Sequence, residues 1–152
     1  MKIFVAFLVL LCLSLAFSLP LPGAAFADEV QIGTVKTVKG KAYIVSGGQE
    51  TLATVGAAVR QNDTLKTASD GAVGVTFVDN TTLSLGPKSE LAVTSYIFQP
   101  RVDKFSFVAQ LTKGSFMFVS GLIAKLSPSS VALQTPVGTL GVRGTRFLVD
   151  VD

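Results

Sequence analysis

The sequence predicts an all-β domain, a jelly-roll-like β-sandwich built from short strands. Segments rich in β-branched and aromatic residues recur along the chain, and Gly, Pro, Asn and Asp turn signals separate them. Turn signals spaced by about eight to twelve residues are typical of sandwiches and jelly rolls. No segment keeps a helical periodicity over several turns. A β-solenoid is the alternative, and the lack of a strong internal repeat ranks it second.

The expected strands follow one another from residue 32 to the end of the chain. They cover residues 32–38, 41–45, 52–59, 64–67, 72–79, 82–85, 91–98, 102–111, 115–119, 131–134 and 141–151. Glycine supplies the positive φ of tight turns, so Ser46–Gln49 and Lys113-Gly114 are predicted turns. Ser120–Leu126 predicts one helical turn, which Pro128 ends.

The bulky aromatic residues are the expected core. Phe105, Phe107 and Ala109 lie two positions apart and therefore share one face of a strand, while Lys104, Ser106 and Val108 share the other. Phe116 and Phe118 repeat this spacing in the next expected strand. A β domain without disulfides needs such large side chains to fill its interior.

The first residues carry the pattern of a secretory signal peptide. Lys2 precedes an apolar run over residues 3–19, and proline and glycine follow within residues 20–23. Ala25-Phe26-Ala27 then offers the small-x-small cleavage pattern, with Asp28 as the first mature residue. An uncleaved membrane anchor is the alternative, since the apolar run approaches the length that spans a bilayer. Either reading exports the remainder of the chain.

Cleavage divides the chain into a signal peptide, residues 1–27, and one domain of ordinary size, residues 28–152. The only cysteine, Cys12, lies in the signal segment after Leu11, where a lipobox needs a small residue. The domain therefore has no disulfide, and apolar burial must stabilise it. Without Lys2, the 13 Lys and Arg residues become 12 against 10 Asp and Glu. A net charge this small argues against a nucleic-acid surface.

The chain contains no histidine, which restricts its chemistry. Ser-His-Asp and Cys-His nucleophiles and imidazole metal sites are excluded. The acidic residues are spread singly, no D-x-D-x-D-G calcium loop occurs, and Asp70-Gly71 is a plain turn signal. Two distant carboxylates could still meet as an acid/base pair, with Asp63 and Asp79 as its best candidates. We expect no catalytic residue, cofactor or metal.

The C-terminal glycines do not form a phosphate-binding loop. Gly138, Gly141 and Gly144 are followed directly by the apolar run Phe147–Val149, which predicts a strand. A phosphate loop would lead into a helix, whose first N–H groups bind the anion. The context therefore excludes that interpretation.

The motifs together resemble a FecR-type domain, a β-rich module of bacterial envelope proteins. Five stretches carry the resemblance in order: Gly33–Gly40, Gly56 with Asn62–Thr67, Phe77–Ser89, Lys113-Gly114, and Thr135-Pro136 with Gly141–Phe147. Asn62 and Asn80 stand where the family pattern has glycine. Asparagine is the best substitute for glycine at positive φ, so both departures are mild.

Most motif residues are expected to be structural. They are Gly56, Asp63, Thr67, Asp79, Pro87, Gly114, Pro136, Gly144, Thr145 and Phe147. Asp63 and Asp79 should accept hydrogen bonds from turn amides, and Pro87 and Pro136 suit turns or edge strands. Gly144 should mark a bulge or a close backbone approach.

Two arginines near the end of the chain are the candidate ligand or partner contacts. Arg143 stands between two glycines, and Arg146 directly precedes the apolar run Phe147–Val149. The structural alternative for Arg143 is a guanidinium bound to backbone carbonyls or to a buried carboxylate such as Asp79. The functional alternative is a fixed donor for an anionic or sugar ligand.

The resemblance implies a role in envelope recognition or signalling. Signalling members join a periplasmic FecR domain through a membrane helix to a cytoplasmic segment that controls a sigma factor. This sequence resembles instead the stand-alone exported members, without its own anti-sigma segment. We expect a non-catalytic periplasmic or secreted module that binds an unknown envelope protein, through an exposed sheet edge, and no nucleic acid. Membrane contact is expected only through an uncleaved signal segment.

A carbohydrate- or peptidoglycan-binding module is the alternative function. The composition weakens it, because sugar rings usually stack on tryptophan or tyrosine, and the chain has no tryptophan and only two tyrosines, Tyr43 and Tyr96. The identity of the ligand, the oligomeric state and a continuation of the domain beyond Asp152 stay open.

Overall fold

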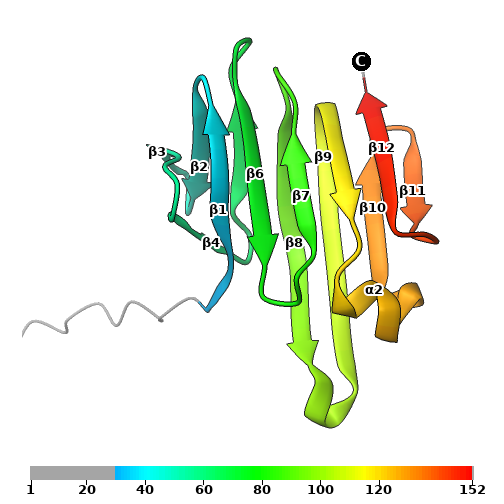
Figure 1. Ribbon diagram of the computed structural model, residues 1–152. Helices are drawn as coiled ribbons and strands as arrows, with labels where there is room; N and C mark the ends of the chain where they lie inside the picture. Colours follow the sequence, from blue (N-terminus) through cyan, green and yellow to red (C-terminus); the bar gives the residue numbers. More distant parts are fainter. Residues whose placement is uncertain (1–29, 152) are drawn as a thin grey trace, which may run out of the picture.

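The computed structural model describes residues 30–151, and the expected signal peptide lies outside this range. Twelve strands form one continuous, mostly antiparallel sheet that folds over into two layers around a shared core (Figure 1). The all-β sandwich expected from the sequence is confirmed. The pairing also excludes the solenoid, whose neighbouring strands run parallel, because within residues 30–151 only β9 and β10 pair in that way.

The two layers meet in one long strand, β9 (Lys104–Val119). The front layer contains, in spatial order, β4 (Ala58–Arg60), β1 (Gln31–Lys39), β6 (Ala72–Phe77), β7 (Thr82–Leu85), the second half of β9, and β12 (Arg146–Val151). The back layer contains β3 (Gln49–Leu52), β2 (Ala42–Ser46), β5 (Thr64–Thr67), β8 (Glu90–Gln99), the first half of β9, β10 (Val131–Thr135), and β11 (Gly138–Gly141).

The division of β9 that the sequence predicts at Lys113-Gly114 is wrong. Gly114 has a φ of +83°, which bends the strand without ending it, and the chain passes from the back layer to the front layer there. The close approach of Ser89 makes glycine necessary. A Cβ on Gly114 would lie 2.5 Å from Ser89 Cα.

Two other expected strands are also interrupted. Residues 52–59 form no single strand, because turns around Gly56 separate β3 from β4. Residues 141–151 are divided by a loop over residues 142–145, which separates β11 from β12. The expected helical turn is confirmed as α2 (Leu122–Leu126), followed by a 3₁₀ turn, η2 (Pro128–Ser130). Another 3₁₀ turn, η1 (Pro100–Val102), joins β8 to β9.

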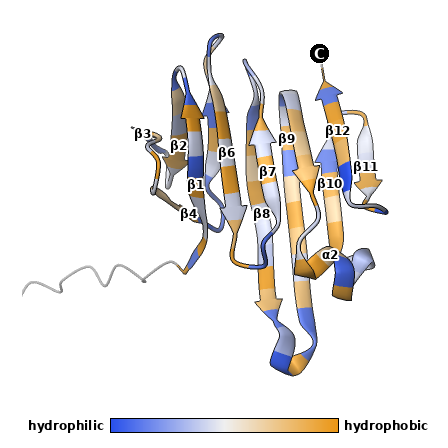
Figure 2. Ribbon diagram, in the orientation of Figure 1, coloured by the Kyte–Doolittle hydropathy of each residue, from blue (hydrophilic) through white to orange (hydrophobic). Residues whose placement is uncertain are grey.

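Aromatic rings fill the core between the layers. Phe107 makes edge contacts with Phe77 and Phe118, at centroid distances of 5.0 and 5.5 Å. Phe107, Phe116 and Phe118 are fully buried, as expected, whereas Phe105 is half-buried. Hydrophobic residues run along the strands of both layers (Figure 2). Within residues 30–151, no helix has the length and apolar character needed to cross a membrane.

Candidate functional site

Asp79 is the centre of a buried hydrogen-bond cluster that joins three elements. Its Oδ1 accepts hydrogen bonds from Thr81 N–H at 3.2 Å and from the Tyr96 hydroxyl at 3.0 Å. Its Oδ2 accepts from the Thr81 hydroxyl at 2.6 Å and from Ile123 N–H at 3.1 Å. The Asp79 carbonyl accepts from Leu122 N–H at 2.8 Å. The cluster thus fixes the β6–β7 turn against β8 and the start of α2.

Tyr96 was not predicted as part of this cluster. Burial, and next the negative charge of Asp79, raise the pKa of Tyr96 well above its usual value. The hydroxyl therefore stays protonated and can donate to the carboxylate, while it accepts a hydrogen bond from Asp79 N–H at 3.0 Å. No local sequence pattern links the two residues, because they are 17 positions apart.

Asp63 closes a second turn. Its carboxylate accepts hydrogen bonds from Arg60 N–H at 2.7 Å and from the Ser46 hydroxyl at 2.5 Å. The neighbouring Asn62 has a φ of +68°, and Asn80 beside Asp79 has a φ of +65°. The expectation that both asparagines replace glycine at positive φ is confirmed.

Three motif elements that are distant in sequence meet at the bend of β9. Thr67 donates its hydroxyl to Gly86 C=O at 2.6 Å and accepts from Ser89 N–H at 2.9 Å. The Ser89 hydroxyl in turn donates to Ser115 C=O at 3.0 Å and accepts from Ser115 N–H at 2.9 Å. These hydrogen bonds hold the loop between β7 and β8 against the strand that passes between the layers.

The remaining motif residues lie in turns and at the C-terminal edge. Gly56 lies in the turn before β4, Pro87 in the turn after β7, and Pro136 in the β10–β11 turn. The bulge or close approach expected at Gly144 is not found. A Cβ there would meet nothing within 4 Å, and Gly144 instead provides a φ of +129° in the loop before β12. Thr145 follows it in the same loop.

Arg143 and Arg146 are both exposed, and neither forms an ion pair with another residue of the described range 30–151. The suggested pairing of Arg143 with Asp79 is wrong, because Tyr96, Thr81 and Ile123 occupy that carboxylate. Arg143 lies in the loop before β12, and Arg146 is the first residue of β12.

The outer edge of β12 is unpaired within residues 30–151, since β12 pairs only with β9. Along an antiparallel ladder, residues that bond to the neighbouring strand alternate with residues whose backbone groups point away from it. Ser120 N–H donates to Thr145 C=O at 2.9 Å, so every second residue counted from Thr145 bonds to β9. The backbone groups of Arg146, Leu148 and Asp150 consequently point away from β9. Their side chains are exposed as well, and Leu148 is 71% exposed.

The back layer extends one strand further than the front layer at this end, because β11 lies beyond β12 (Figure 1). Leu140 of β11 pairs with Leu133 of β10 and therefore faces the core side with it. Leu133 is 1% exposed, whereas Leu140 is 43% exposed because no front strand covers it. Phe147 of β12, the last strand of the front layer, is half-buried and stacks on Phe118 at 5.1 Å.

The buried carboxylates are engaged in structural hydrogen bonds. Asp63 and Asp79 each accept from backbone and hydroxyl donors. Every buried side-chain polar atom of the described residues has a hydrogen-bond partner. In the same range, no group of three or more His, Cys, Asp or Glu residues is placed to hold a metal ion.

These features define an all-β domain whose polar motif residues support turns and whose sheet has an open edge. A family model described as FecR protein matches residues 63–152, and the chain belongs to that family. The match begins at Asp63 and covers the Asp79 cluster, the whole of β9 and the C-terminal strands β10, β11 and β12. The FecR family is associated with signalling in the bacterial envelope. Neither a curated protein nor a solved structure matches the chain.

Proposed function

We propose that this protein is an exported, non-catalytic module of the bacterial envelope that binds another protein by accepting one of its strands at β12. The observation that carries this proposal is the outer edge of β12, with which no strand of the described residues 30–151 pairs and whose outward backbone groups belong to Arg146, Leu148 and Asp150. Exposed sheet edges are ready templates for pairing, and main-chain hydrogen bonds supply the affinity in such complexes.

The side chains of β12 define the complementary strand. An antiparallel partner would place an acidic residue opposite Arg146 and a basic residue opposite Asp150. Its inward side chains would lie over β11, where Leu140 is uncovered on the core side. The partner strand should therefore alternate, with charged or polar residues outward and apolar residues inward.

A second copy of the chain fits this edge less well. Two antiparallel β12 strands would be complementary in charge, with Arg146 opposite Asp150. However, β11 extends past β12 in each copy, so it would meet the back layer of the other copy. A strand from a different protein meets no such obstacle.

The proposed location is the periplasm or the cell exterior, after cleavage near Ala27 and Asp28. Family membership supports the envelope, and the apolar run over residues 3–19 supports export. N-terminal sequencing of the protein recovered from periplasmic and culture fractions should begin at Asp28. A chain recovered only from the cytosol contradicts this location.

Proline at position 148 tests strand addition directly. The Leu148 N–H points outward, so Leu148→Pro removes a free donor and leaves the β9 ladder intact. Leu148→Ala is the matched control, since it shortens the same side chain and keeps the donor. We expect envelope proteins crosslinked to the wild type and to Leu148→Ala to be lost with Leu148→Pro. Equal crosslinking by all three, or a dimer as the only product, would overturn the proposal.

A further inference from the structure

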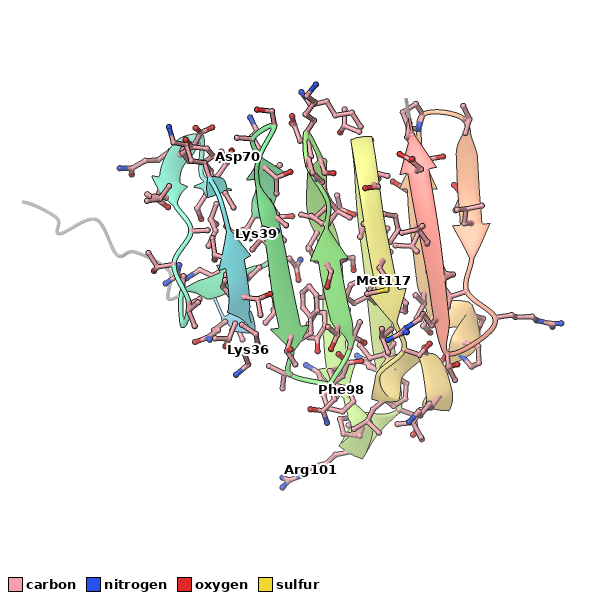
Figure 3. The ribbon with its side chains drawn as sticks, turned by 45° about the horizontal axis from the view of Figure 1, so that its top comes forward. Lys36, Lys39, Asp70, Phe98, Arg101 and Met117 are labelled. Atoms are coloured by element: carbon pink, nitrogen blue, oxygen red, sulfur yellow. The ribbon has the colours of Figure 1, made fainter. Side chains whose placement is uncertain are left out.

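A groove of about 470 Å³ lies between the start of β1 and the end of β8. This volume falls within the range of ligand-binding sites. No residue of β9–β12 lines the groove, so it is separate from the edge at β12. Figure 3 shows Phe98, one of its lining residues, near the foot of the sandwich and above Arg101.

The β8 backbone is partly unpaired beside this groove. On that side, β5 pairs with β8 only at residues 90–92, and Val93 is held by hydrogen bonds with Asn62 and Asp63. Tyr96 N–H reaches the side chain of Gln61 at 3.3 Å and therefore points away from β9. By the alternation of the β8–β9 ladder, the Phe98 N–H and C=O and the Tyr96 C=O share this direction. Within residues 30–151, none of these three groups has a partner on that side.

The lining of the groove is uncharged. None of its ten residues is Asp, Glu, Lys or Arg. Its apolar part includes Val30 and Val78, which are 78% and 59% exposed, and Ile97 of β8. Its polar part consists mainly of carboxamides, including Gln61 and Asn62, which can both donate to and accept from peptide groups.

We propose that this groove binds an uncharged, extended peptide segment of a partner protein, which adds to β8 as a short strand. The segment takes the place that β5 would occupy if β5 continued to pair along β8 beyond Val93. Free backbone groups at Tyr96 and Phe98 pair with it, and Val78 and Ile97 contact its side chains. A charged ligand would be desolvated there without an opposite charge, which is unfavourable. This site goes beyond the proposed function, because it does not require β12.

A capped pentapeptide, acetyl-Thr-Val-Thr-Val-Thr-amide, is the probe for this site. Calorimetry and amide chemical shifts measured on the purified chain should show binding, with the largest shifts at Phe98 and Val78. Val78→Lys places a charge on the groove lining that a bound peptide would cover, and it should weaken binding in the groove about tenfold. Val137→Lys is the matched control, since Val137 is 91% exposed in the β10–β11 turn, and it should bind as the wild type does.

The β12 variant separates this inference from the proposed function. The same alternating peptide can also pair with β12, so the two sites are separated by their amide shifts: Leu148→Pro should leave the peptide-induced shifts at Phe98 and Val78 unchanged. Absence of binding to the wild type, or an equal loss with Val78→Lys and Val137→Lys, would overturn the groove proposal. Loss with Leu148→Pro but not with Val78→Lys would mean that the peptide binds at β12. That outcome would contradict the groove site and leave the strand acceptor at β12 in place.

Discussion

Tyr96 and Asp79 bind each other twice across the core, since the tyrosine hydroxyl donates to the carboxylate and accepts from the Asp79 amide, both at 3.0 Å. Tyr96 is also one of the residues that line the groove beside β8, and its ring stacks on Phe77 at 5.6 Å. Through the hydrogen bond from Ile123 N–H to Asp79, the same pair holds the start of α2. A change at this pair should therefore affect the whole fold.

Removal of the carboxylate should destabilise the domain strongly. Asp79→Ala leaves buried donors of Thr81, Tyr96 and Ile123 without an acceptor, which should lower the free energy of unfolding by about 3 kcal/mol. Urea denaturation followed by circular dichroism measures this loss. Asp150→Ala is the control, because Asp150 is exposed on β12, and its change should stay within about 0.5 kcal/mol. Equal stability of the two variants would contradict a structural role for Asp79.

Stability should also fall at alkaline pH. The pKa of Tyr96 is raised in the folded state by burial and by Asp79, so the folded protein retains a proton that the unfolded chain releases above about pH 10. This contribution is complete below that pH and decreases as the pH rises further. The free energy of unfolding of Tyr96→Phe should therefore decline less steeply above pH 10 than that of the wild type. Parallel pH profiles would exclude the tyrosine as the cause.

Gly114→Ala should destabilise the passage of β9 between the layers. The new Cβ would approach Ser89 and strain a φ of +83°, so we expect a loss of about 2 kcal/mol or more. Gly141→Ala is the matched control in β11, where a Cβ would meet nothing within 4 Å. Thermal denaturation should show a lower Tm for Gly114→Ala alone. The same Tm for both variants would contradict the account of the bend.

The charges on β12 should select the sequence of an added strand. A capped Lys-Val-Thr-Val-Glu peptide, antiparallel to β12, places glutamate opposite Arg146 and lysine opposite Asp150. It should bind more tightly than Glu-Val-Thr-Val-Glu and Lys-Val-Thr-Val-Lys, and the difference should shrink at high salt. In Arg146→Glu, the all-lysine peptide should become the best of the three. Unchanged preferences in that variant would contradict the proposed register.

The sequence predicted the layered β architecture because its strong signals are local. The turns at Asp63 and Asp79, the helical turn before Pro128 and the buried Phe116 and Phe118 all follow from short patterns. The continuity of β9 does not follow from a short pattern. A glycine at positive φ can either end a strand or bend it, and only the close approach of Ser89 determines that Gly114 bends β9.

The candidate site was only partly predictable. An exposed sheet edge was expected, and Arg146 lies on one, but the sequence does not show which strand is last in its layer. The extension of β11 beyond β12, and the part of β8 that β5 leaves unpaired after residue 92, arise from unequal strand lengths and layer widths. Those are properties of the assembled sheet, and no single segment encodes them.

Amide hydrogen exchange along β12 tests the central proposal most directly. In the free protein, the amides of Arg146, Leu148 and Asp150 should exchange fast, whereas those of Phe147 and Val149 are bonded to β9 and should exchange slowly. Saturating Lys-Val-Thr-Val-Glu should slow the three fast amides, and the same peptide N-methylated at its threonine should have little effect. Slow exchange at all five positions without peptide, or no slowing at the three outward amides when it is bound, would contradict strand addition at this edge.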